Sequence, residues 1–278
     1  MAMYMLSFVQ MILSCIIPTR NEEAHVADCV TALAPLVEAG TAEVIVVDNA
    51  STDRTVELAG AAGARVVQQG PERSAQRNRG AREAAGDFLL FLDADMILPR
   101  ETADEIVARI SAPSAPDGLW VREVRTGSGL RVKARNFERS FYDATCIDAL
   151  RVFRREVFMH VGGYDTALCG PEDWDLDRRF LAETANVALT DGHLLHNEAN
   201  LSLRRVLKKK AYYSNTMAAY REKWHDDAVV RRQLGIGYRF FGVFAENGKW
   251  RRVLRHPILF ATMMFERVCV AATYLANR

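Results

Sequence analysis

Two acidic residues, Asp93 and Asp95, stand at the end of an uninterrupted hydrophobic run over residues 88–92. A short apolar run bounded by polar residues predicts a buried strand, from whose carboxyl end the two carboxylates emerge. Hard divalent cations prefer oxygen ligands and bind readily against phosphate oxygens. The pair therefore indicates a site for a metal ion and a diphosphate, although an isolated Asp-x-Asp is as often a solvated turn.

A second acidic group, Glu172, Asp173, Asp175 and Asp177, follows Pro171. Its first members fall in the first turn of a helix predicted over residues 171–182, where acids complement the helix dipole. Four acids beside a tryptophan exceed what capping requires, so the cluster predicts a general base.

Two histidines, His193 and His196, follow a strand predicted over residues 186–189. A lone histidine is usually structural. A histidine at the end of a strand beside an acidic metal site is, however, a natural additional ligand.

Two further polar residues have both a functional and a structural interpretation. Asp48 ends a strand predicted over residues 43–47, where it could accept a hydrogen bond from a nucleotide base or stabilise a turn. Arg77 lies on a helix predicted over residues 72–85. It could contact phosphate or ribose, or be an ordinary solvated arginine.

The elements that position these residues alternate between strands and helices. Strands are predicted over residues 12–17, 43–47, 65–68 and 87–92, and helices over residues 22–39, 53–62, 72–85 and 99–110. This order predicts an α/β fold with a mostly parallel sheet flanked by helices. Such sheets bind ligands beyond the carboxyl ends of their strands, which is where the polar residues fall.

The second part of the chain is less regular. A hairpin is predicted over residues 119–124 and 130–133, followed by a strand over 149–153 and a helix over 156–161. We divide the chain into an α/β domain, residues 1–200, and a helical basic C-terminal extension, residues 201–278.

Composition limits the class of protein. With 49% hydrophobic and 26% charged residues the 278-residue chain is of ordinary globular type. Five scattered cysteines without a Cys-x-x-Cys pair favour the reducing cytoplasm. The net charge of +1 conceals 20 basic and 30 acidic residues before position 201, and 16 basic and 5 acidic residues after it.

Six motifs, in register along roughly residues 11–200, closely resemble the family 2 glycosyltransferases of GT-A fold. They are Ile16-Ile17-Pro18-Thr19-Arg20-Asn21-Glu22-Glu23, Val46-Val47-Asp48-Asn49-Ala50-Ser51-Thr52-Asp53, Arg77-Asn78-x-Gly80, Phe91-Leu92-Asp93-Ala94-Asp95, Gly162-Gly163-Tyr164-Asp165 and Glu172-Asp173.

The resemblance implies an inverting transferase that uses a nucleotide-activated sugar, with UDP as the leading carrier, and a divalent metal, Mg²⁺ or Mn²⁺. It makes residues 1–200 the nucleotide-sugar-binding and catalytic domain. It further implies a nucleotide pocket formed by Pro18, Arg20, Glu22, Asp48 and Arg77. On the same basis Asp93 contacts ribose or metal, Asp95 and His196 bind the metal, and Asp173 is the catalytic base.

The basic extension admits three interpretations. Cations interleaved with aromatic residues, as in residues 208–213, suit the anionic cytoplasmic face of a membrane and a lipid-linked acceptor. Alternatively, the helices pack on the catalytic domain, or they form a homodimer interface. Nucleic-acid binding is disfavoured because no such motif accompanies the charge.

Two other functions compete with glycosyl transfer. One is a non-catalytic module that binds a nucleotide sugar or a membrane, which the intact acids oppose. The other is a sugar nucleotidyltransferase, which would need a glycine-rich phosphate loop after the first strand. Residues 18–22 contain no glycine.

Overall fold

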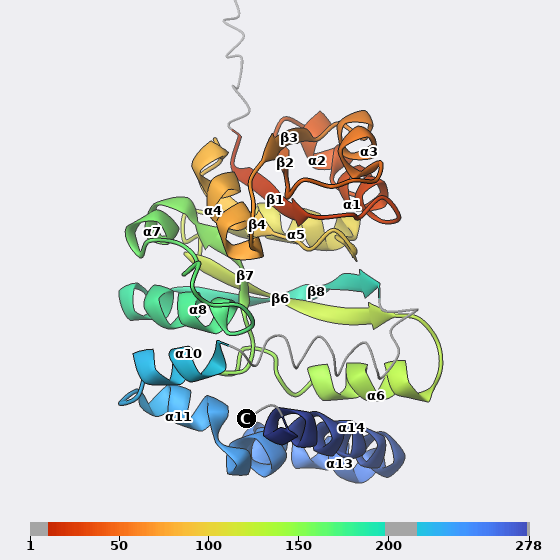
Figure 1. The fold of residues 1–278 in the computed structure, drawn as a ribbon, viewed down its shortest axis with the longest axis vertical. Helices are drawn as coiled ribbons and strands as arrows, with labels where there is room; N and C mark the ends of the chain where they lie inside the picture. Colours follow the sequence, from red (N-terminus) through yellow and green to blue (C-terminus); the bar gives the residue numbers. More distant parts are fainter. Residues whose placement is uncertain (1–10, 198–215, 277–278) are drawn as a thin grey trace, which may run out of the picture.

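The computed structural model describes residues 11–197 and 216–276. Within them, eight strands form one sheet with helices on both faces, and the C-terminal helices make a further layer at one end of the molecule (Figure 1). The strands are β1 (Leu13–Thr19), β2 (Ala42–Asp48), β3 (Arg65–Gln68), β4 (Phe88–Phe91), β5 (Met96–Ile97), β6 (Gly118–Thr126), β7 (Leu150–Arg154) and β8 (Val187–Asn197).

The strand order is β3-β2-β1-β4-β7-β6-β8-β5. The first four strands of this order run parallel to one another, as expected from the alternating pattern. In the other half, β7 is antiparallel to both β4 and β6, β8 runs parallel to β6, and β5 is antiparallel to β8. The α/β fold is confirmed, with antiparallel pairing confined to the second half.

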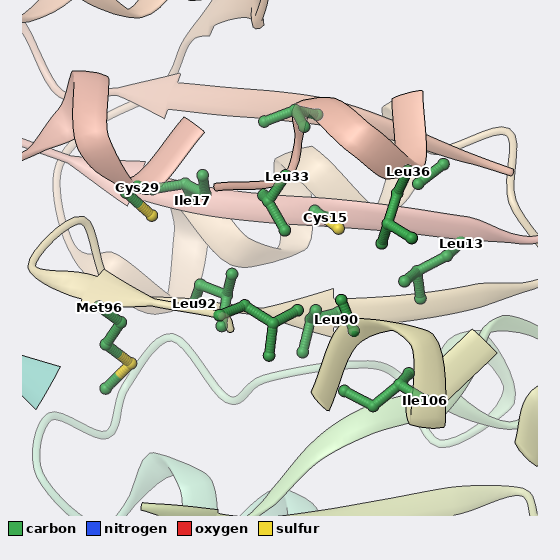
Figure 2. Packing of buried hydrophobic residues seen from close by; sticks show 14 of the residues in the cluster. Leu13, Cys15, Ile17, Cys29, Leu33, Leu36, Leu90, Leu92, Met96 and Ile106 are labelled. Carbon is green, nitrogen blue, oxygen red and sulfur yellow. The ribbon is translucent and has the colours of Figure 1, made fainter. Parts of the chain in front are cut away.

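Residues 11–197 belong to the predicted catalytic domain, and we call them the catalytic body. Its helices are α1 (Val26–Thr31), α2 (Ala34–Glu38), α3 (Thr55–Ala61), α4 (Arg73–Glu83), α5 (Arg100–Ile110), α6 (Leu130–Arg139), α7 (Arg155–His160) and α8 (Glu172–Glu183). Side chains alternate between the two faces of a strand. Leu13, Cys15 and Ile17 of β1 accordingly point to the face covered by α1, α2 and α5 (Figure 2). Ile16 points to the opposite face, among residues of α4, α7 and α8.

Three predicted elements differ from the structure. The helix expected over residues 22–39 is two helices, because the chain turns at Ala32 and Leu33 ahead of Pro35. The strand expected over residues 130–133 is wrong, since these residues begin α6. Ala134 and Phe137 lie at helical spacing on its buried side. The last predicted strand is longer than expected and continues to Asn197 as β8.

The described part of the C-terminal extension consists of helical segments, α10 (Met217–Lys223), α11 (Ala228–Leu234), η1 (Tyr238–Gly242), α12 (Val243–Ala245), η2 (Glu246–Gly248), α13 (Trp250–Arg255) and α14 (Pro257–Ala276). Val243, Phe244 and Met263 pack against Phe137 and Phe141 in and after α6. None of the helices in the described residues is long and apolar enough to cross a membrane. The proposed boundary at residue 200 and the 208–213 cluster lie outside the described residues.

Candidate active site

The polar loops after β1 and β2 are bonded directly to each other. The Asn21 amide donates to Ser51 Oγ at 2.8 Å, and its side-chain oxygen accepts from the Thr52 amide at 2.8 Å. One residue later, the Glu22 amide donates to Thr55 Oγ1 at 2.7 Å. Two of the predicted nucleotide-binding segments therefore form one structural unit at the carboxyl edge of the sheet.

Within this unit, Pro18 and Asp48 are buried at the ends of neighbouring strands, and Arg20 is exposed. Asp48 accepts hydrogen bonds from Thr19 Oγ1 at 3.1 Å and from the Ser51 amide at 2.9 Å. Its carboxylate thus stabilises the turn after β2, the structural role that the sequence left open. A contact between Asp48 and a nucleotide base stays a prediction.

Helix α4 is held against the ends of β1 and β2 by its buried polar side chains. Gln76 donates to the carbonyl oxygens of Thr19 at 2.8 Å and Val47 at 2.6 Å. Gly80 lets the helix approach closely, because a Cβ there would lie 2.4 Å from a methyl group of Ile16. The glycine of the Arg-Asn-x-Gly motif is therefore required for packing, and the close packing places Arg77 over the carboxyl edge.

Arg77 bridges two of the predicted site residues. Its side chain is 1% exposed, and its two terminal nitrogens donate to Asp173 Oδ1 at 2.9 Å and to Asp93 Oδ1 at 3.0 Å. The guanidinium also lies 5.0 Å from the ring centre of Tyr164. Burial alone would lower the pKa of Arg77, but the neighbouring Asp173 and other groups outweigh it and raise that pKa. Arg77 therefore stays charged and joins the two carboxylates.

The next residue, Asn78, fixes the turn that supplies Tyr164. Its side-chain nitrogen donates to the Tyr164 carbonyl, and its oxygen accepts from the Tyr164 amide, both at 2.8 Å. Gly163 adopts a φ of +66°, a left-handed conformation that favours glycine. The Arg-Asn motif and the Gly-Gly-Tyr-Asp motif are far apart in sequence but contact each other directly in the structure.

The four acids of the 172–177 cluster have four different environments. Glu172 is buried and accepts from Arg73 at 2.6 Å, and Asp175 is buried against Arg179, Lys223 and Trp224. Asp177 is buried and accepts from the Leu150 amide at 3.0 Å. Only Asp173 among the four has a substantially exposed side chain, at 27%. Glu172, Asp175 and Asp177 are therefore held in structural contacts, and Asp173 is the one acid of the four that is open to a substrate.

A second cluster joins Asp95 to His196 and to Glu123, which the sequence analysis did not single out. His196 Nε2 lies 3.3 Å from Asp95 Oδ2, and Nδ1 lies 2.9 Å from Glu123 Oε1. The Asn197 amide also donates to the Asp95 carbonyl at 2.9 Å, where β5 pairs with β8. His193 is exposed and not part of this cluster.

The charges around His196 favour its protonated form when no cation is bound. Burial alone would lower the pKa of His196, but hydrogen bonds to Asp95 and Glu123 outweigh it and raise the pKa to about 9. Burial would likewise raise the pKa of Glu123, but His196 and three nearby arginines hold that pKa well below its usual range. Glu123 is therefore an anion that fixes the ring of His196.

No group of three or more His, Cys, Asp or Glu side chains within the described ranges is arranged to hold a metal on its own. Asp95, immediately before β5, supplies one carboxylate, and His196 of the neighbouring strand β8 supplies one imidazole nitrogen. This donor set suits Mn²⁺ or Mg²⁺ if diphosphate oxygens complete the coordination. Glu123 completes the carboxylate–histidine pairing that commonly orients a metal-binding histidine.

Comparisons with known proteins identify the family. The model of the family "Glycosyl transferase family 2" matches residues 14–162, more than half of the chain. Glucosyl-3-phosphoglycerate synthase of Mycobacterium tuberculosis is 36% identical over 96 residues, which are 31% of this chain and 30% of that protein. An uncharacterized glycosyltransferase of Rickettsia typhi is 26% identical over 207 residues, covering 74% of this chain and 66% of that protein.

Solved structures extend the similarity to the whole fold. Mannosyltransferase PcManGT from Pyrobaculum calidifontis, in complex with GDP-Man and Mn²⁺, has a TM-score of 0.58 at 17% identity and covers 96% of this chain and 86% of its own. Residues 1–349 of S. aureus TarS, in complex with UDP-GlcNAc, give 0.57 at 19% identity, with coverage of 96% and 90%. At these identities the similarity shows the fold alone.

The chain belongs to glycosyl transferase family 2 and has the GT-A fold. The alignment to the mycobacterial synthase spans less than a third of that protein's length. The family does not by itself fix the substrates of this chain.

Proposed function

We propose that this protein is an inverting, metal-dependent glycosyltransferase that transfers a sugar from a nucleoside diphosphate sugar to an acceptor hydroxyl. The observation that carries the proposal is the bridge formed by Arg77. It places the partly exposed acid Asp173 and the strand-end acid Asp93 on one guanidinium, at 2.9 and 3.0 Å. A base for the acceptor thus lies next to the carboxylates assigned to the donor.

Asp173 is suited to accept the proton. Its Oδ1 is held by Arg77, and its Oδ2 accepts no hydrogen bond from the described residues. In the proposed reaction, the acceptor hydroxyl gives its proton to Asp173 and its oxygen forms a bond to the anomeric carbon. The bond between that carbon and the diphosphate breaks, and its electron pair leaves with the diphosphate. Attack from the opposite face inverts the configuration.

Asp95 and His196 would hold the divalent metal, which would neutralise charge developing on the leaving diphosphate. Asp93 would contact the ribose or the metal, and its bond to Arg77 fixes its orientation. Pro18, Arg20, Glu22 and Asp48 would surround the nucleotide. Structural neighbours in complex with UDP, UDP-GlcNAc and GDP-Man support a nucleoside diphosphate, and we take UDP as the first carrier to test.

For the acceptor we propose a lipid-linked hydroxyl at the cytoplasmic face of a membrane. The support is the charge distribution of the chain, since residues 201–278 carry 16 basic and 5 acidic residues. Such a segment is attracted to anionic lipid headgroups.

The direct test is a screen of nucleotide sugars for metal-dependent hydrolysis or transfer, followed by proton NMR of the first product formed. We expect inversion at the anomeric carbon. Asp173→Asn should lower turnover by about a hundredfold to ten-thousandfold, since general-base assistance contributes that much. Donor binding should change little, because the amide oxygen can still accept from Arg77.

Asp226→Asn, an exposed acid beyond α10, is the matched control and should be fully active. Retention of configuration, or full turnover in Asp173→Asn at saturating acceptor, would refute the assignment of Asp173 as the base of an inverting reaction.

A further inference from the structure

Helix α14 has an unusual distribution of side chains for the surface of a water-soluble protein. Its charged residues, Glu266 and Arg267, face the protein, where they pair with Arg131 at 2.5 Å and with Glu138 at 2.8 Å. Met263 beside them is buried against the core of α6. The charges of the helix are therefore satisfied internally and leave its other side to apolar residues.

That other side is a continuous exposed hydrophobic stripe. Its members recur every three or four residues, the period of one helix face, and are Ile258, Ala261, Phe265, Val268 and Ala272. Ile258 and Phe265 are 69% and 64% exposed. Trp250 and Leu254, four residues apart on α13, are also exposed. We call the exposed apolar residues of α13 and α14 the outer face.

The exposed charged residues between positions 250 and 272 are all positive. Arg251, Arg252 and Arg255 of α13 are exposed, and no acidic residue between positions 250 and 272 is exposed. Arg251 lies over the ring of Trp250 at 5.6 Å. Both helices lie at one end of the long axis of the molecule, opposite α2 and α3 (Figure 1). The outer face and its arginines are therefore accessible together.

We propose that the outer face docks on an anionic lipid surface, with the apolar side chains in the interface and the arginines at the headgroups. This inference rests on the proposed function and identifies the surface that makes the membrane contact proposed there. Helices with an apolar face and adjoining cations bind membranes in this way. A second copy of the chain fits less well, because symmetric pairing would bring like-charged arginines together.

The test is co-sedimentation of the full chain with vesicles of phosphatidylcholine alone, or mixed with phosphatidylglycerol, over a salt series. The wild-type protein should prefer the anionic vesicles and lose binding as salt rises. The triple variant Leu254→Ser, Ile258→Ser, Phe265→Ser should bind at least about tenfold more weakly, because each large side chain contributes buried apolar area. Arg251→Gln with Arg255→Gln should reduce the preference for anionic lipid.

Two matched variants on the catalytic body control for exposed apolar area and for charge. They are Val56→Ser with Met159→Ser, and Arg82→Gln with Arg100→Gln, and both should bind like wild type. Circular dichroism and hydrolysis of the donor sugar, measured on the same preparations, separate loss of docking from loss of folding or catalysis.

Vesicle binding by the triple variant equal to that of wild type would overturn the proposal. The proposal would also be overturned if the wild-type protein formed a dimer in light scattering and did not bind vesicles, and if the triple variant were monomeric. That second result would assign the outer face to a homodimer.

Discussion

At the scale of single residues, the environment of Arg77 in the structure differs most from the one that the sequence indicated. The sequence suggested a nucleotide contact or a solvated surface residue. In the structure it is buried and donates to both Asp93 and Asp173. No local pattern reveals this, because the partners are 16 and 96 residues away in the chain. We interpret Arg77 as a positioning residue that sets the distance between donor and base. Its contact with the nucleotide stays a prediction.

Arg77→Lys tests this role. Lysine keeps the charge but lacks the planar fork that spans two carboxylates, so one of the two bonds is lost. We expect turnover to fall by at least about tenfold, the equivalent of one charge-assisted hydrogen bond of about 1.5–3 kcal/mol. Arg79→Lys on the exposed side of α4 should be neutral. Steady-state kinetics with the donor varied provide the comparison, and equal kcat in both variants would contradict the role of Arg77.

Glu123 shows a limit of reasoning from sequence at the same scale. It lies within β6, is 8% exposed and has no motif around it. Its importance comes from His196, 73 residues later, which lies opposite Arg125 in the paired strand β8 and whose Nδ1 is 2.9 Å from the Glu123 carboxylate. A buried acid in a strand is the only signal, and it became interpretable once β6 and β8 were paired.

At the scale of elements, α8 shows how one helix assigns different functions to similar residues. Its N-terminal acids Glu172 and Asp173 face the arginines of α4. Asp175 instead accepts from Trp224, just beyond α10, at 2.9 Å and so attaches the C-terminal helices to the catalytic body. Asp177, one turn after Asp173, is buried and accepts a hydrogen bond from the Leu150 amide. Helical periodicity explains the division, since successive acids point in different directions.

The buried carboxyl of Asp177 predicts a pH dependence of stability. Burial raises its pKa well above the ordinary value, and Asp173 adds to the shift. As pH rises, the Asp177 carboxyl ionises at a lower pH in the unfolded chain than in the folded protein. The contribution of Asp177 to the free energy of unfolding therefore falls as pH rises from about 3.9 toward its raised pKa. Asp177→Asn keeps an acceptor for Leu150 and removes the ionisation.

The melting temperature of Asp177→Asn, relative to wild type, should therefore increase with pH across that window. Thermal melts from acidic to mildly alkaline pH measure this difference, with Asp191→Asn as an exposed control. A constant difference at all pH values would show that Asp177 ionises equally in both states.

The sequence predicted the first half of the sheet better than the second. Residues 11–92 alternate regularly between helices and strands that are centred on adjacent apolar residues, so these strands and most of these helices were located closely. The antiparallel half depends on pairing between distant strands. It also includes a two-residue strand, β5, that no periodicity could reveal. Helix α6 was mistaken for a strand because its first four residues alternate in polarity.

At the scale of the whole molecule, the residues of the candidate site were predicted from the sequence, and the contacts between them were not. Asp48, the Asp93–Asp95 pair and His196 were identified at the ends of predicted strands, whereas Arg77 and Asp173 were placed on predicted helices. The structure brings Asp95 to His196, and Asp93 to Asp173 through Arg77. These links join segments that are far apart in the chain, so they follow from the fold rather than from any single motif.

The central claim is that Asp95 and His196 bind a divalent metal together with a nucleoside diphosphate. Isothermal titration with UDP, in Mn²⁺ and in chelator, tests it most directly, with Asp95→Asn and His196→Ala compared against His193→Ala. We predict Mn²⁺-dependent UDP binding in the wild type and in His193→Ala, and its loss in the other two variants while they stay folded. Equal binding of UDP with and without metal, or unchanged binding in Asp95→Asn, would contradict the account.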